Sequence, residues 1–486
     1  MDLIYTTLNW LLLFLYLMLT FKIILNIFIN RCTISEFISW LSILYIFPFI
    51  GIILYILLGK LNIDKKIKNK NKIICSFSKE WIENLKSYKY IFTKKNSNVA
   101  YSVFQLCKHS QGIDGLTGNK IKLLVNSFDF IDELIHDIKY AKKNIEIVFY
   151  AWKVEGLINK VTNALISASK RGVRCKLILD SIGSMQFFHS IYHNKMRDAG
   201  IIIIKALQIN ILDIFFRRID LRQHKKMILI DNYISYIGSM NMVDPRFFKK
   251  NFGIGRWIDI MLRMEGPVTI FMKISFSCDW AIETGERILF FPIKLNVVSI
   301  KKFSKHVIQI VSSGSNYPKE IIQQVLLTSI YSARKILIIT TPYLVPSNDL
   351  LYAICSAAQR GVKVHIIIPF ENDSILVHWA SRVFFTELLE AGVLLYQFTG
   401  GLLHTKSILI DNQLSFIGTV NLDIRSLLIN FEITLIIDSS DFSKDLIRVQ
   451  KKYIEQSKLL EIISWSRRPY WKKIMEKFFY LFSPLL

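Results

Sequence analysis

The sequence predicts an α/β protein made of two similar halves that share one site, behind a pair of membrane-spanning helices. A motif of the form H-x-K-x4-D, followed by G-[ST]-x-N, occurs first at His224 and again at His404. Strand-like and helix-like segments alternate in the same order around each copy, which favours a duplicated α/β sandwich. Two apolar N-terminal stretches are each close to the ~20 residues that cross a bilayer as a helix.

The N-terminal region, residues 1–59, is expected to be a membrane anchor with helices at about 3–21 and 38–58. The first stretch lacks a basic start and a small-x-small cleavage site, which disfavours a cleaved signal peptide. The connection is short, so the two helices should form a hairpin. Arg31 lies between them, whereas six lysines follow the second: Lys60, Lys65, Lys66, Lys68, Lys70 and Lys72. This asymmetry predicts a multi-pass protein whose large C-terminal part faces the cytoplasm.

The formal net charge of +24 fits a nucleic-acid partner, an anionic membrane surface, or a coding bias toward lysine. The location of the basic runs favours the membrane, because they lie beside the apolar stretches and in the C-terminal tail, WSRRPYWKKIMEKFFYLF. An amphipathic core helix is an equally weighted alternative for that tail. The six cysteines are scattered without a C-x-x-C pair, so we expect no structural disulfide and a reducing compartment.

Behind the anchor we expect a basic linker and entry segment at 60–118, a first half at 119–300 and a second half at 301–486. The first half should contain a helix at 128–141 and strands at 144–150 and 174–180. An Ala-Gly pair occurs at the same place in each half, and its two copies are 192 residues apart (391 − 199), but the two histidines are only 180 apart (404 − 224). The first half therefore carries an insertion, with Phe215, Phe216, Arg217 and Arg218, which we interpret as a lid or lipid-contacting loop rather than a neutral surface insertion.

The repeated motif points to phosphodiester chemistry. Residues i and i+2 of a strand share a face, so each histidine projects beside a lysine, Lys226 or Lys406. Two opposed imidazoles suit an in-line displacement, in which a neutral one attacks phosphorus and a protonated one gives its proton to the leaving alcohol. No metal or cofactor is required. The expected donors to the phosphate oxygens are Lys226, Ser239, Asn241, Lys406, Thr419 and Asn421.

Four carboxylates accompany these residues. Asp259 and Glu432 follow the histidines of their own halves, at separations of 35 (259 − 224) and 28 (432 − 404), and are expected to orient those imidazoles. Asp231 and Asp411 complete the repeated motif and are counted with it as catalytic candidates. Each stands at a strand end before an asparagine, so turn capping is preferred to direct chemistry for both.

These residues form the signature of the phospholipase D superfamily, and the chain resembles the bacterial cardiolipin synthases with two transmembrane helices. The likeness extends over YIFPFIGIILYILLGK, DLRQHKKMILIDNYISYIGSMNMVDPRFF, RMEGPV, SCDWAIETGERIL and FFYLFSPLL. It implies a duplicated phospholipase D-like sandwich in the bacterial inner membrane that converts two phosphatidylglycerol molecules into cardiolipin and glycerol. It further implies a phosphohistidine on His224, with His404 as acid and base, and leaves the oligomeric state open.

Three alternatives remain at this point. A lipid hydrolase, or a transferase that uses another alcohol, would have the same fold, and product analysis with defined lipids separates these activities. A nuclease would use the same motif, but the membrane anchor argues against a nucleic-acid partner. A catalytically inactive membrane scaffold is disfavoured because both motifs are intact.

Overall fold

A computed structural model describes residues 2–29, 34–58, 96–208, 220–248, 255–286, 306–314, 317–318 and 320–483. The chain divides into two compact units. The first consists of Met1–Lys72 with Gln208–Leu221, and the second of Ile73–Leu207 with Arg222–Leu486. Several features expected from the sequence lie outside the described residues: the lysines between 60 and 72, Arg31, and the aromatic-basic positions 215–218.

The N-terminal unit begins with α1 (Asp2–Ile29), a 28-residue helix. Its segment Ile4–Ile29 is the one helix in the described ranges that is long and apolar enough to cross a membrane. The second expected span is instead divided into α2 (Ile34–Ile46) and α3 (Pro48–Leu58), on either side of Phe47. Pro48 disfavours the helical conformation for the residue before it, Phe47, which explains a break at this position. The 13 residues of α2 reach only ~20 Å, against a bilayer core of ~30 Å.

Helices α2 and α3 fold back on each other at this break. A Cβ added to Gly51 would lie 2.9 Å from the carbonyl oxygen of Ile43, so only glycine permits this approach. The buried side chains of the unit come from all three helices, and Asn26 Nδ2 on α1 donates to the Tyr55 hydroxyl on α3 at 2.9 Å. A hairpin with two membrane-spanning helices therefore stays a proposal.

The second unit contains two large sheets, seven- and eight-stranded among the described residues. In spatial order the first consists of β1 (Lys120–Leu124), β8 (Met261–Glu265), β6 (Ile234–Gly238), β5 (Met227–Ile230), β2 (Asn144–Phe149), β3 (Arg174–Asp180) and β4 (Ile202–Ala206). The second consists of β9 (Val307–Ser313), β18 (Glu432–Asp438), β16 (Leu414–Gly418), β15 (Ser407–Ile410), β10 (Ile336–Thr340), β12 (Lys363–Pro369), β13 (Leu394–Phe398) and β19 (Ser457–Leu459).

The two sheets have the same topology strand for strand, with β19 added to the second. In the first, β2 runs parallel to β3 and antiparallel to β5; in the second, β10 runs parallel to β12 and antiparallel to β15. The expected helix at 128–141 and strands at 144–150 and 174–180 are confirmed as α6 (Ser127–Tyr140), β2 and β3. The predicted duplicated α/β fold is therefore confirmed.

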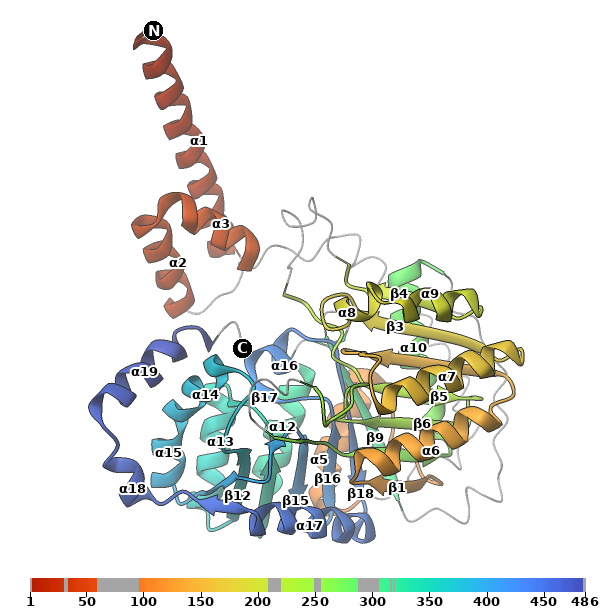
Figure 1. Cartoon of the computed structure of the whole chain (residues 1–486). Helices are drawn as coiled ribbons and strands as arrows, with labels where there is room; N and C mark the ends of the chain where they lie inside the picture. Colours follow the sequence, from red (N-terminus) through yellow and green to blue (C-terminus); the bar gives the residue numbers. More distant parts are fainter. Residues whose placement is uncertain are drawn as a thin grey trace. The chain divides into compact units, whose positions relative to one another are not determined.

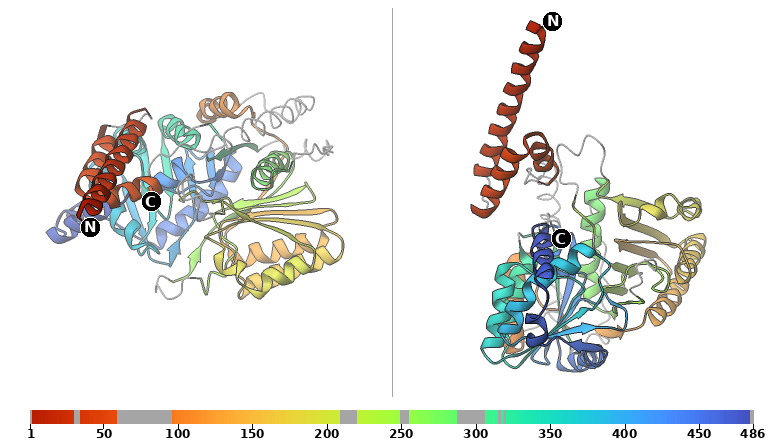
Figure 2. Two further views of the ribbon diagram at one scale, coloured as in Figure 1. Left: turned by 90° about the horizontal axis from the view of Figure 1, so that it is seen from above. Right: turned by 60° about the vertical axis from the view of Figure 1, so that its left-hand side comes forward.

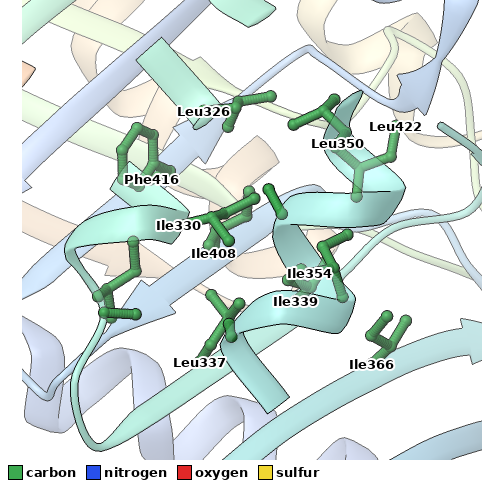
Figure 3. Packing of buried hydrophobic residues seen from close by; sticks show 14 of the residues in the cluster. Leu326, Ile330, Leu337, Ile339, Leu350, Ile354, Ile366, Ile408, Phe416 and Leu422 are labelled. Atoms are coloured by element: carbon green, nitrogen blue, oxygen red, sulfur yellow. The ribbon is translucent and has the colours of Figure 1, made fainter. Parts of the chain in front are cut away.

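Three apolar cores stabilise the two halves. The outer face of the first sheet is covered by α6 and α7 (Leu157–Lys170), and that of the second by helices including α12 (Ile321–Ser332) and α13 (Asn348–Gln359) (Figure 1). Figure 3 shows the core of the second half, where α12 and α13 pack on strands β10 and β15. The third core joins the halves and includes α10 (Val268–Thr284) and α17 (Ser440–Glu455); α10 lies between the sheets in both views of Figure 2.

The entry segment is part of the folded unit. It forms α5 (Asn98–Gln111), whose buried side chains, such as Val103 and Phe104, pack in the core of the second half. The hydroxyl of Ser97, at the start of α5, donates to Asp438 at the end of β18 at 2.7 Å. Residues 98–111 therefore belong to the second half, although they precede the first half in the chain. The described cysteines Cys107, Cys175, Cys278 and Cys355 are free.

Candidate active site

The two histidines occupy equivalent places in the two sheets. His224 and Lys226 immediately precede β5, and His404 and Lys406 immediately precede β15, near the centre of each sheet. Both lysines are buried, and each Nζ donates to the backbone carbonyl of the histidine two residues before it, at 2.9 Å in the first half and 2.7 Å in the second. Each lysine ammonium group therefore lies next to the backbone of the histidine in its own half.

Backbone pairing brings the two halves together at this point. The short strand β14 (Leu402–Leu403) pairs in parallel with β7 (Trp257–Ile258), and His404 N donates to the Ile258 carbonyl at 2.9 Å. In the other half Gln223 forms a parallel bridge with Phe431, and His224 N donates to the Phe431 carbonyl at 2.9 Å. Each histidine is thus held beside the residue that comes next in the opposite half, Asp259 or Glu432.

The carboxylates are consequently crossed between the halves. His224 Nδ1 lies 2.8 and 2.9 Å from the two carboxylate oxygens of Glu432, and His404 Nδ1 lies 2.7 Å from Asp259 Oδ1. The expectation that each carboxylate serves the histidine of its own half is wrong. The reason is the parallel pairing across the halves, which places the end of each histidine segment next to the carboxylate-bearing segment of the other.

The hydroxyls of the G-[ST]-x-N segments support these carboxylates. Thr419 Oγ1 donates to Glu432 Oε2 and accepts from Ile433 N at 3.0 Å. Ser239 Oγ accepts from Ile260 N at 3.1 Å, and its interaction with Asp259 helps to lower the pKa of that carboxyl. Both hydroxyls were expected to bind the phosphate directly. Their observed role is instead to hold the residues that orient the histidines.

The electrostatics of the two lysines are dominated by burial. Burial lowers the pKa of Lys226 to about 8 and that of Lys406 to about 7, and the charge of Lys226 contributes to the second shift. Burial also lowers the pKa of His404, and it lowers the pKa of His224 well below the usual range, assisted by the nearby charges of both lysines. The site therefore favours a neutral His224 and carries cationic groups that lack full solvation, an arrangement suited to an anionic ligand.

The two carboxylates differ in their protonation. Burial raises the pKa of Glu432 to about 7, despite the opposing effects of Lys226 and of its hydrogen-bond donors. Burial acts in the same direction on Asp259, but the interactions with His404 and Lys406 outweigh it and hold the pKa of this carboxyl below its usual value. Asp259 is thus an ionised partner for His404, and the surroundings of the two histidines are chemically unequal.

Asn241 and Asn421 follow the central hairpins and are buried. Among the described residues, the side-chain oxygen of each has no hydrogen-bond partner. Asn421 Nδ2 donates to Ser426 Oγ at 3.2 Å, at α16 (Ile424–Leu428). Because buried polar groups are normally paired, these two amides have bonding capacity left for a ligand.

Asp231 and Asp411 serve the backbone rather than the reaction. Asp231 accepts hydrogen bonds from the backbone N–H groups of residues 142, 143 and 144, and Asp411 from those of residues 334, 335 and 336, at 2.7 to 3.0 Å. Each aspartate comes seven residues after its histidine (231 − 224 and 411 − 404), which is roughly 23 Å of extended chain. These contacts favour the capping interpretation of Asp231 and Asp411 over direct participation in the reaction.

Aromatic neighbours of the histidines were missed. Tyr150 makes an edge-on contact with His224, with ring centroids 5.2 Å apart, and Trp257 lies against His404 at 4.7 Å. Tyr150 directly follows β2, and ligand sites in α/β sheets gather at such strand ends, so its position in the sequence was an available signal. The position of Trp257 depends on the pairing of β7 with β14, which no local pattern reveals.

Lys225, between the first histidine and lysine, points away from them as expected and is fully buried. Its Nζ lies 2.8 and 2.9 Å from the carboxylate oxygens of Asp279 on α10 and 3.1 Å from Ser275 Oγ. Thr405 occupies the equivalent position in the second half and contacts Tyr453 OH at 3.3 Å. The first histidine segment is therefore tied to the helix between the sheets by an ion pair that the second half lacks at this position.

Comparison with known proteins agrees with this geometry. The family model described as "Cardiolipin synthase, PLD-like domain" matches residues 134–259 and 326–454. A protein of Wigglesworthia glossinidia brevipalpis named cardiolipin synthase A is 56% identical over 100% of this chain and 98% of its own length. The protein of the same name from Pectobacterium carotovorum is 52% identical over the full length of both chains.

A solved structure shares the fold. The phosphatidylserine synthase of Haemophilus influenzae superposes with a TM-score of 0.56 over 80% of this chain and 100% of its own, at 16% sequence identity. At that identity the likeness concerns the fold alone. The family model covers more than half of the chain, and the relatives match it from end to end. The chain therefore belongs to the cardiolipin synthase family of phospholipase D-like proteins.

Proposed function

We propose that this protein, a phosphatidyltransferase by family, joins two phosphatidylglycerol molecules into cardiolipin and releases glycerol through a phosphohistidine intermediate. The observation that carries the mechanism is the pair of histidines, His404 buried and His224 partly buried, each with Nδ1 on a carboxylate. Such a bond directs Nε2 of each ring toward the reacting phosphate.

In the first step, His224 Nε2 attacks phosphorus of the first lipid. Its low pKa keeps the ring neutral, and Glu432 accepts a hydrogen bond from Nδ1–H and stabilises the positive charge that develops on the imidazole. The phosphorus–oxygen bond to glycerol breaks, and the leaving oxygen takes a proton from His404 Nε2. The ionised carboxylate of Asp259 favours the protonated form of His404 that this role needs.

In the second step, the free glycerol hydroxyl of another phosphatidylglycerol attacks the phosphohistidine. His404, now neutral, accepts the hydroxyl proton while the phosphorus–nitrogen bond breaks and His224 is restored. Lys226 and Lys406 would neutralise the phosphate oxygens throughout. Asn241 and Asn421 would add donors by rotating their amides, and the Ser426 hydroxyl can then donate to the Asn421 oxygen that turns toward it.

Product analysis tests this proposal. Purified protein supplied with phosphatidylglycerol should form cardiolipin and glycerol in equal amounts, whereas phosphatidic acid without cardiolipin would show a hydrolase instead. His224→Ala and His404→Ala should each abolish turnover. His136→Ala, on the outer helix α6, is the matched histidine control and should be active. Protein quenched with denaturant at alkaline pH, where the phosphorus–nitrogen bond survives, should carry the phosphoryl group on His224, and finding it on His404 would reverse the two roles.

The membrane arrangement is a separate proposal. Family membership and α1 indicate membrane association, and we expect a multi-pass anchor in the bacterial inner membrane with the catalytic part in the cytoplasm. If α1 and the α2–α3 segment both cross, the two ends of the chain lie on the same side. If α1 alone crosses, they lie on opposite sides. Reporter fusions at each terminus distinguish the two arrangements, and opposite sides would overturn the two-span anchor.

A further inference from the structure

The C-terminal helix α19 (Tyr470–Tyr480) is fixed to the second half through one of its faces. It lies at the outer edge of that half beside α14 (Ile375–Ser381) (Figure 1). Glu476, almost fully buried, accepts hydrogen bonds from Arg382 Nε at 3.2 Å and from Arg468 Nε at 3.1 Å. Trp379 of α14 stacks on Phe479, with centroids 6.4 Å apart. These contacts determine which way the other face of the helix points.

That other face is apolar and largely exposed. Its exposed side chains, which we call the α19 stripe, are Tyr470 (76% exposed), Trp471 (56%), Ile474 (52%), Phe478 (51%) and Leu481 (74%). At about 100° per residue these five positions fall within roughly 100° of the helix surface. Soluble surfaces rarely expose so contiguous a row of large apolar side chains, so the stripe marks a contact with another phase or molecule.

The chemistry of the stripe fits one occupant, an anionic phospholipid surface. Tyrosine and tryptophan prefer the headgroup region, where the ring is in contact with lipid and the polar atom with water. Lys472, Lys473 and Lys477 lie on the same helix outside the stripe, where they complement negatively charged headgroups. The stripe lies on a single helix with cations beside it and does not form a groove that would receive a protein segment. This arrangement favours a lipid surface over a protein segment as the occupant.

We propose that the α19 stripe inserts into the headgroup region of a bilayer containing anionic phospholipid, as a membrane contact additional to the N-terminal anchor. The stripe is connected to the active site through α14. That helix begins two residues after Asp373, which accepts a hydrogen bond from the Tyr343 hydroxyl at 2.8 Å and acts electrostatically on Lys406. Docking of α19 would therefore fix the orientation of the catalytic unit on the lipid that supplies its substrates.

A depth measurement tests the contact directly. The full-length chain carrying Ile474→Cys is labelled with an environment-sensitive fluorophore and placed in nanodiscs that contain phosphatidylglycerol. We expect a blue-shifted emission that spin-labelled lipids quench. Asp445→Cys, exposed on α17, is the control and should show neither effect, and the unsubstituted labelled chain is the blank. Equal quenching at both positions, or none at Ile474, would overturn the proposal. A blue shift without quenching, in a particle holding two chains, would identify a second copy as the occupant and also overturn it.

An activity measurement separates this contact from the chemistry of the site. Ile474→Ser/Phe478→Ser should lower cardiolipin formation on phosphatidylglycerol bilayers about tenfold or more, and leave it unchanged in detergent micelles, where lipid reaches the site from solution. Tyr331→Ser/Tyr352→Ser removes two similarly exposed apolar side chains from α12 and α13 and should leave both activities unchanged. Equal loss in bilayers and micelles, or no loss in either, would contradict the proposal. If the wild type and all variants formed no cardiolipin in bilayers or in micelles, that result would count against the proposed function instead.

Discussion

Replacing Glu432 with glutamine tests the crossed arrangement of the site. The substitution keeps the size of the side chain but replaces the carboxylate whose oxygens lie 2.8 and 2.9 Å from His224 Nδ1. An amide can donate to Nδ1, which would move the ring proton to Nε2 and block attack on phosphorus. The same kind of change behind the catalytic histidine of a serine protease costs about 10,000-fold in kcat, or about 5.5 kcal/mol of barrier. We expect a loss of roughly 1,000- to 10,000-fold.

A substrate with a 4-nitrophenol leaving group turns this loss into a test of pairing. Nitrophenolate departs without being protonated, so its pre-steady-state burst reports only the attack by the nucleophilic histidine. The burst should disappear in His224→Ala and Glu432→Gln, and remain in His404→Ala and Asp259→Asn. If His404 is the nucleophile, all four results should reverse together. A burst that is lost in His224→Ala and Asp259→Asn but kept in Glu432→Gln would refute the crossed pairing, whichever histidine attacks.

Three further outcomes follow from the described contacts. Because burial lowers the pKa of Lys406 to about 7, its phosphate-binding charge is lost as pH rises through that value, and kcat/KM should fall on the alkaline side of the pH–rate profile. Lys406→Arg should move this alkaline fall to higher pH. A fall that stays at the same pH would assign it to another group. Lys225→Met leaves Asp279 buried without its counter-charge and should lower the free energy of unfolding, measured in urea, by about 3–5 kcal/mol. The double variant Lys225→Met/Asp279→Leu should regain most of this stability. Equal losses in both variants would show that the pair is not coupled. Asp231→Ala removes the acceptor of three backbone N–H groups and should cost about 2–3 kcal/mol without changing kcat of the folded protein, while a specific loss of kcat would return Asp231 to the catalytic set.

Much of the fold could be predicted because the chain is duplicated. Two copies of one pattern constrain each other, so the alternation of strands and helices around His224 and His404 was sufficient to predict the fold. Asp231 and Asp411 could be placed at turns because each precedes an asparagine at a strand end, and both have left-handed backbone conformations, with φ of 53° and 52°.

The crossed pairing could not be predicted, because it depends on contacts between distant segments. Asp259 and His404 are brought together by two residues of strand in each half, β7 and β14, which carry no pattern of their own. Ser239 and Thr419 were misplaced for a related reason: the spacing of a hydroxyl from a histidine does not say which neighbour it will contact. The break at Phe47 was within reach, since Pro48 follows it, but a hydropathy average over the whole stretch conceals a local change of direction.

The crossed hydrogen bonds bear on the ancestry of the chain. A protein with only one such half would hold a histidine whose orienting carboxylate is missing. It would have to pair with a copy of itself, so that each copy supplies the carboxylate for the other's histidine. Fusion of two genes makes that encounter permanent and removes the requirement that both partners be identical. The two halves can then carry different residues: Glu432 behind one histidine and Asp259 behind the other, and Lys225 in the first half where the second has Thr405. The inequality of the two histidines is therefore a change that a symmetric dimer of identical chains could not have made.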